Sequence, residues 1–180
     1  MYYAGIGSRN TPVVILNMFQ ELGRSLAEKG YVLRSGRADG ADSYFEKGAV
    51  SAVGGCEIFL PWKSFQSNSE LASYPAIIFD AMDKRQQAAA LESVNHYHPN
   101  PRALSAGARK LMARNYCQLF GTSPESEPSG FVVCYTSDGL ASGGTGQAIR
   151  MASDANIPVF NAHGYESHPD DFITLVLSNI

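Results

Sequence analysis

The chain has 180 residues, of which 44% are hydrophobic and 17% are charged, and its formal net charge is −3. A chain of this length and apolar content can bury a single core, so residues 1–180 are interpreted as one domain. The small excess of acidic residues argues against a protein whose main role is to coat nucleic acid, because that role requires a densely basic surface, but it is compatible with a local basic groove.

The sequence also favours a particular compartment. No stretch approaches the roughly 18 apolar residues of a membrane span, and the N-terminus lacks the charged and apolar regions of a secretion signal. The 3 cysteines, at positions 56, 117 and 134, are widely spaced and odd in number, which indicates reduced thiols. We therefore expect a cytoplasmic protein that has no membrane partner.

The first third of the chain alternates strands and helices. Apolar runs at 2–6, 31–35 and 56–60 predict strands, and the spacing of apolar residues within 12–29 and 41–53 predicts helices. Such alternation is typical of a parallel sheet whose helices lie on both faces, joined by right-handed crossovers.

The regular pattern is lost from position 62 to about 101. This segment is rich in Ser, Asn, Gln and Ala, and only the part around 83–94 predicts a helix. It is too long for an ordinary connection, so we interpret it as an irregular insertion that covers or borders the site. Trp62 and Tyr74 within it are either stacking surfaces for a base or cover for the sheet edge.

Regularity returns in the second half. The pattern predicts helices over 105–120 and 147–153, strands at 131–135 and 157–160, and a final helix near 169–177. The predicted fold class is therefore α/β. We expect a Rossmann-like, doubly wound and mainly parallel sheet of about five strands, with helices on both faces.

The glycine-rich stretch from Ser137 to Gln147 is the strongest functional signal. It lies between a strand and a helix, so its backbone amides can approach an anion without obstruction by Cβ atoms, beside a helix N-terminus. The spacing matches neither the dinucleotide fingerprint nor the Walker pattern. The alternatives are a phosphate-binding loop and a connection that needs glycine only for its turns.

Two other loops also follow a strand and precede a helix, namely 7–9 and 35–42. The carboxyl ends of parallel strands share one edge, and ligands bind where the strand order reverses. We therefore expect the three loops to form one nucleotide- or phosphate-binding site. Its assigned residues are Gly7, Ser8, Arg9, Ser35, Gly36, Arg37, Asp39, Asp42, Ser142, Gly143, Gly144, Thr145, Gly146 and Gln147.

Charged residues in these loops suggest roles. Arg9 or Arg37 is expected to offer a forked donor to phosphate. Asp39 and Asp42 are candidates for binding a ribose hydroxyl or for acid–base chemistry; the alternatives are a helix N-cap for Asp39 and a first-turn carboxylate for Asp42. The histidines within 96–98 lack further ligands, so neither a metal nor a separate cofactor is expected.

These motifs resemble the SLOG superfamily of Rossmann-like nucleotide-binding domains, and within it the DNA-processing protein A family of DNA recombination mediators. The resemblance rests on 7–9, on Ser-Gly-Arg-Ala-Asp-Gly-Ala-Asp at 35–42, on the helix at 109–115 and on the loop at 142–148. It implies a Rossmann-like fold, adds Arg109 to the nucleotide-binding residues, and implies single-stranded DNA as a partner. A homodimer is expected by analogy with related domains.

A partial similarity connects the chain to the cytokinin-activating phosphoribohydrolases, once misnamed lysine decarboxylases. Their Arg-Lys-x-x-Met helix is similar to 109–113, and their Pro-Gly-Gly-x-Gly-Thr-x-x-Glu loop is similar to 142–150. Arg150 stands where that family has its catalytic glutamate, and an arginine cannot supply the carboxylate that glycosidic hydrolysis needs. Asp39, Asp42 and Glu46 are the weaker candidates to replace it.

The sequence therefore favours binding of a nucleotide, or its phosphoribosyl part, at the carboxyl edge of the sheet. The protein would act as a sensor, as a sequestering protein or in the manner of DNA-processing protein A. One alternative is a nucleotide N-glycoside hydrolase or transferase, and another is a single-stranded DNA-binding recombination mediator. Whether the chain is an enzyme stays open at this point.

Overall fold

The computed structural model describes residues 1–180 and contains one sheet of 6 strands. In chain order the elements are β1 (Tyr2–Gly7), α1 (Val13–Glu28), β2 (Val32–Ser35), α2 (Ala41–Ser51), β3 (Cys56–Leu60), β4 (Ile77–Ile78), the short turn η1 (Phe79–Ala81), α3 (Lys84–Tyr97), the short turn η2 (Pro101–Ala103), α4 (Ala106–Phe120), β5 (Phe131–Tyr135), α5 (Gly143–Asp154), β6 (Val159–Asn161) and α6 (Pro169–Ser178).

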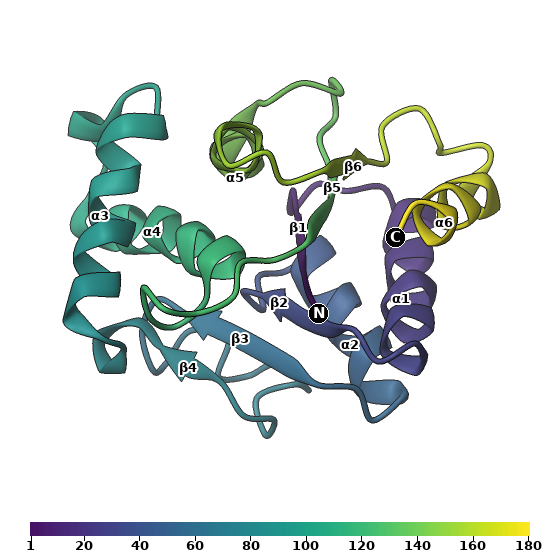
Figure 1. The fold of residues 1–180 in the computed structure, drawn as a ribbon, viewed down its shortest axis with the longest axis horizontal. Helices are drawn as coiled ribbons and strands as arrows, with labels where there is room; N and C mark the ends of the chain where they lie inside the picture. The colour runs from purple at the N-terminus through teal and green to yellow at the C-terminus, as the bar shows by residue number, and fades with distance from the viewer.

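All neighbouring strands are parallel, in the order β4-β3-β2-β1-β5-β6 (Figure 1). The chain adds β2, β3 and β4 on one side of β1, then returns to the other side of β1 with β5 and β6. The strand order therefore reverses between β1 and β5, where Ile6 pairs with Cys134. The predicted doubly wound Rossmann-like fold is confirmed, with 6 strands rather than about five.

Successive residues of β1 face opposite helical layers, as expected for a strand. Tyr3 packs in a core cluster with Phe19 of α1 and Phe45 of α2, which α6 completes. The adjacent Ala4 packs in a second cluster with Leu119 of α4 and residues of α5. Consequently α1, α2 and α6 cover one face, whereas α3, α4 and α5 lie on the other (Figure 1).

The segment at 62–101 contains more regular structure than its composition indicates. Its residues Ile77 and Ile78 form the edge strand β4, which pairs with the end of β3. Helix α3 extends to Tyr97, beyond the predicted 83–94, and packs on α4 through Ala90 and Val94. A strand of 2 residues carries no alternating pattern, so sequence periodicity cannot reveal β4.

The glycine-rich stretch is also more regular than predicted. Helix α5 begins at Gly143, so Gly144 and Gly146 lie in its first turns rather than in the preceding loop. The sequence places the start of this helix at Gln147, because glycine is unfavourable in helix interiors. Observed strand β6 is also shifted, to Val159–Asn161 from the predicted 157–160.

The three cysteines are free thiols. Burial raises the pKa of the Cys117 and Cys134 thiols to about 12, so both remain protonated and unreactive at neutral pH. None of the helices combines the length and the apolar character needed to cross a membrane.

The packing of α1 on α2 generates a stability prediction. A Cβ atom at Gly48 would overlap the backbone carbonyl oxygen of Gln20 in α1, whereas a Cβ at Gly107 in α4 would meet only Trp62, at 3.7 Å. We expect Gly48→Ala to lower the free energy of unfolding by about 1–3 kcal/mol through overpacking. Gly107→Ala, the matched control, should leave it unchanged or raise it by up to about 1 kcal/mol, because alanine favours the helix.

Urea denaturation of both variants measures the difference. An unchanged midpoint for Gly48→Ala would contradict the close approach of the two helices.

Candidate functional site

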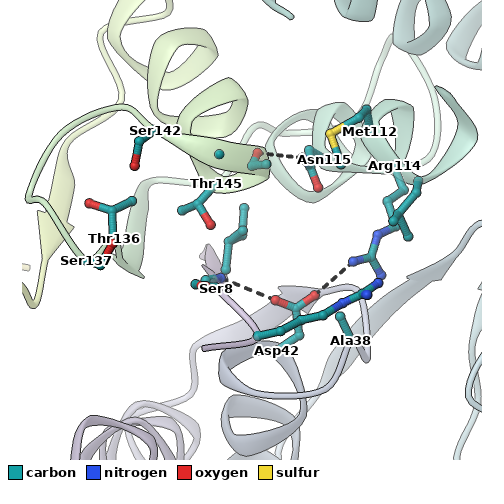
Figure 2. Close-up of a pocket in the computed structure, with 16 residues that line it drawn as sticks. Ser8, Ala38, Asp42, Met112, Arg114, Asn115, Thr136, Ser137, Ser142 and Thr145 are labelled. Atoms are coloured by element: carbon teal, nitrogen blue, oxygen red, sulfur yellow. Dashed lines mark hydrogen bonds and ion pairs between the residues drawn. The ribbon is translucent and has the colours of Figure 1, made fainter. Parts of the chain in front are cut away.

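A cavity of about 430 Å³ opens at the carboxyl edge of the sheet, beside the point where the strand order reverses (Figure 2). Its walls come from the loops after β1, β2 and β5 and from the helices α2, α4 and α5. The lining residues are Ile6, Gly7, Ser8, Arg9, Ala38, Asp42, Leu111, Met112, Arg114, Asn115, Thr136, Ser137, Ser142, Gly143, Gly144 and Thr145.

The N-terminus of α5 forms one wall. The first N–H groups of a helix have no partner within it, and Gly143, Gly144 and Thr145, which carry those of α5, line the cavity. The N-cap residue Ser142 accepts no hydrogen bond from them, and its hydroxyl turns to donate to Asp138 at 2.9 Å. The uncapped N-terminus therefore presents a partial positive charge and free donors.

Polar side chains next to this wall add neutral donors. Thr136 Oγ1 accepts a 2.7 Å hydrogen bond from Asn161, so its own proton is free for another acceptor. Asn115 Nδ2 donates to the Gly144 carbonyl oxygen at 3.2 Å and so holds the first turn of α5 against α4. Thr136 and Ser137 were not assigned from the sequence, although their position directly after a predicted strand is a signal for this edge.

Arg114 of α4 reaches the bottom of the cavity. Its side chain is 6% exposed; Nη2 lies 3.2 Å from Asp42 Oδ2, and Nη1 donates to the backbone oxygen of Gly36 (Figure 2). The guanidinium also lies over the ring of Phe65, 5.2 Å from its centroid. Its buried Nε has no hydrogen-bond partner, so one charged donor is unsatisfied within the protein.

Asp42, in the first turn of α2, is the only carboxylate that lines the cavity. Its Oδ1 accepts a 3.3 Å hydrogen bond from the backbone N–H of Gly7. Burial raises the pKa of the Asp42 carboxyl and lowers the pKa of Arg114, and each residue's charge opposes the shift of the other. A buried pair that bears such desolvation costs, at a cleft, is characteristic of functional sites.

Arg9 supplies a second cation. It is exposed, lines the cavity and makes no ion pair or side-chain hydrogen bond. Its positive charge contributes to lowering the pKa of Arg114, so the two guanidinium groups repel each other. The charged residues that line the cavity are two arginines, Arg9 and Arg114, and one carboxylate, Asp42. The lining therefore has a net charge of +1.

The structure brings together about half of the residues assigned from the sequence. Those that line the cavity are Gly7, Ser8, Arg9, Asp42, Ser142, Gly143, Gly144 and Thr145. Those that do not line it are Ser35, Gly36, Arg37, Asp39, Glu46, Arg109, Gly146 and Gln147.

Arg37 points away from the cavity. Its Nε lies 3.0 Å from both carboxylate oxygens of Glu46, and both side chains are almost completely buried. Its Nη2 donates to the backbone oxygens of Tyr74 and Pro75, at 3.2 and 3.4 Å. Arg37 and Glu46 thus form an internal ion pair that anchors the segment after β3.

Ser35, Gly36 and Asp39 lie outside the cavity for separate reasons. The Ser35 hydroxyl donates to the backbone oxygen of Gly5 at 2.6 Å, and Gly36 lies against Arg114, where any side chain would overlap the guanidinium. Asp39 does not cap α2, because the N-cap position is Gly40, with a φ of 88°.

Arg109 and Arg150 stabilise contacts between helices. Arg109 Nη1 donates to Asn95 Oδ1 at 2.6 Å, which ties α4 to α3. Arg150 donates through Nη2 and Nε to the backbone oxygen of Tyr97, at 2.7 and 3.0 Å. Neither arginine lines the cavity. Arg150, which aligns with the glutamate of the phosphoribohydrolase motif, therefore lies outside the cavity.

No protein-family model and no curated protein sequence matches the chain. Solved structures match it over almost its whole length. DNA processing protein A from Helicobacter pylori superimposes with a TM-score of 0.56 at 17% identity, covering 99% of this chain and 81% of that chain. The molybdenum cofactor carrier protein from Chlamydomonas reinhardtii gives a TM-score of 0.53 at 18% identity, covering 98% and 84%.

The chain therefore shares the Rossmann-like α/β fold of these two proteins. The resemblance stated from the sequence motifs is thereby confirmed for the fold. At 17–18% identity such likeness establishes architecture, and the ligand has to be inferred from the cavity itself.

The Asp42–Arg114 pair generates a prediction about coupling. Asp42→Asn or Arg114→Met alone leaves a buried charge without its partner, and each should lower the free energy of unfolding by about 3–5 kcal/mol. The double variant removes both charges, so it should lose clearly less than the sum of the two.

Urea denaturation at pH 7 of the wild type and the three variants measures this coupling. The exposed pair Glu21–Arg24, with its 2.6 Å separation, is the matched control and should couple by less than about 1 kcal/mol. Additive losses at Asp42 and Arg114 would show that the pair is not the contact described.

Proposed function

We propose that the chain binds a phosphate-bearing small molecule, a nucleotide or its phosphoribosyl part, in the cavity at the carboxyl edge. The phosphate lies at the N-terminus of α5, between Arg9 and Arg114. One observation carries the proposal: an uncapped helix N-terminus, the unpaired Arg9 and the buried Arg114 all line the same cavity.

The charges of the lining support an anionic ligand. An anion between Arg9 and Arg114 relieves their repulsion and neutralises the net charge of +1. The oxygens of a phosphate accept from the amides of Gly143 and Gly144 and from guanidinium donors, which form the stronger, charge-assisted hydrogen bonds. Within the protein the N-terminus of α5 has no side-chain cap, and Arg114 already donates through Nη1 and Nη2 to Gly36 and Asp42.

The size of the cavity supports a small molecule rather than a long polymer. Its volume of about 430 Å³ falls within the range of small-molecule sites, roughly 300–1,000 Å³. The two solved neighbours differ in ligand, since one is a molybdenum cofactor carrier and the other binds single-stranded DNA. The shared fold therefore supports ligand binding, and the choice of ligand rests on the cavity and on the chain's net charge of −3.

Arg9→Ala tests the phosphate site. We expect it to weaken binding of ribose 5-phosphate and of nucleoside 5′-monophosphates by about ten- to hundredfold, because one charge-assisted contact of roughly 1.5–3 kcal/mol is lost. Arg109→Ala removes the same charge outside the cavity and should leave the affinity unchanged. Isothermal titration calorimetry measures both.

An equal loss in the two variants would show that only general charge matters, which contradicts the site. A short single-stranded oligonucleotide is the parallel probe. If it binds while the mononucleotides do not, the recombination-mediator alternative replaces this proposal.

The cavity does not favour glycosidic hydrolysis. Both carboxylate oxygens of Asp42 are engaged, Oδ1 with the Gly7 N–H and Oδ2 with Arg114, so this carboxylate is a poor base or nucleophile. Glu46 is held in its own ion pair with Arg37. We therefore propose binding without turnover.

Incubation with a panel of nucleoside 5′-monophosphates should release no free base, as followed by liquid chromatography. Release of a base that disappears in Asp42→Asn would instead establish the hydrolase alternative.

A further inference from the structure

The wall of the cavity that faces α5 differs in character from the phosphate side. It is apolar and consists of Leu111 and Met112 of α4, with Ile6 and Ala38 at the bottom. Figure 2 shows Met112 on the side opposite Thr136. A phosphate makes no use of such a wall, because apolar surface offers it no donors. This wall is therefore suited to contact an apolar part of a ligand.

Trp62 is not itself a lining residue of the cavity, but it lies beside α4, the helix that carries Leu111. It follows β3 at the carboxyl edge, and its Cζ3 lies 3.7 Å from the place that a Cβ atom on Gly107 would take. Leu111 lies one helical turn after Gly107, and so on the same face of α4. The indole is 37% exposed, which leaves part of its surface free.

Phe65 connects this indole to the cationic floor of the cavity. The rings of Trp62 and Phe65 meet edge to face, with centroids 5.5 Å apart and an interplanar angle of 88°. The Arg114 guanidinium also lies over Phe65, 5.2 Å from its ring centroid. The aromatic pair is thus fixed in orientation and continuous with a residue that lines the cavity.

We propose that Trp62 and Leu111 form a ring-binding subsite, and that the ligand carries a planar aromatic ring as well as a phosphate. The inference rests on the proposed function, because the phosphate site fixes one end of the ligand. A partly exposed indole near an aliphatic side chain can stack on the face of a planar ring, and a sugar phosphate without a base has no such ring. The protein therefore distinguishes nucleotides from ribose phosphates.

Calorimetric titration with adenosine 5′-monophosphate and with ribose 5-phosphate tests the subsite. Trp62→Ala should weaken nucleotide binding by about ten- to hundredfold, the usual range for loss of one stacking residue, and leave ribose 5-phosphate binding unchanged. Trp62→Phe should retain most of the affinity. Tyr74→Ala removes a 44% exposed ring from the same segment and serves as the matched control.

Trp62 is the only tryptophan of the chain, so fluorescence reports directly on this subsite. Adenosine 5′-monophosphate should quench the emission of the wild type, and ribose 5-phosphate should not. Equal weakening of both ligands in Trp62→Ala, or nucleotide binding without a change in emission, would overturn the subsite but leave the phosphate site intact. If the wild type binds neither compound, the proposed function itself fails.

Discussion

The buried ion pair between Asp42 and Arg114 fixes the carboxyl edge on which the rest of the site depends. Asp42 belongs to α2, on one face of the sheet, and also accepts from Gly7 at the end of β1. Arg114 comes from α4, on the opposite face, and donates to Gly36 after β2. This ion pair thus joins both helical layers and two strand ends. It fixes the positions of the cavity walls relative to one another.

The same contact explains why unsatisfied donors persist at the cavity. Arg114 is held in place by Asp42, Gly36 and Phe65, so its Nε stays oriented even though it has no partner of its own. The first turn of α5 is held similarly, through Asn115. Groups that are oriented before binding lose little freedom when a ligand arrives, which is the physical basis of preorganised recognition.

The sequence predicts most of the fold, because the strands and helices of the first half have clear apolar periods and the parallel topology follows from their alternation. It does not predict β4, which is too short for a period, or the start of α5, where glycines conceal a helix. The sequence also does not show which arginine of α4, Arg109 or Arg114, reaches the site. Arg109 and Arg114 are separated by about 140° around the helix, and only the placement of α4 decides which faces the edge.

The loop arginines illustrate the same limit. Arg9 and Arg37 both follow strands, but Glu46 lies one to two turns into α2 and captures Arg37 in the interior. The pattern of residue types in the sequence locates the site at the carboxyl edge of the sheet. Which charged side chains stay available to a ligand depends on the ion pairs formed inside the protein, and these appear only in the structure.

The way in which Arg37 anchors the segment after β3 affects how this protein can change during evolution. Its guanidinium binds the backbone oxygens of Tyr74 and Pro75, which every amino acid at those positions also provides. Substitutions along the segment that carries Trp62 therefore need not release the anchor. The side chains of this segment can change during evolution while the hydrogen bonds that hold its backbone stay the same.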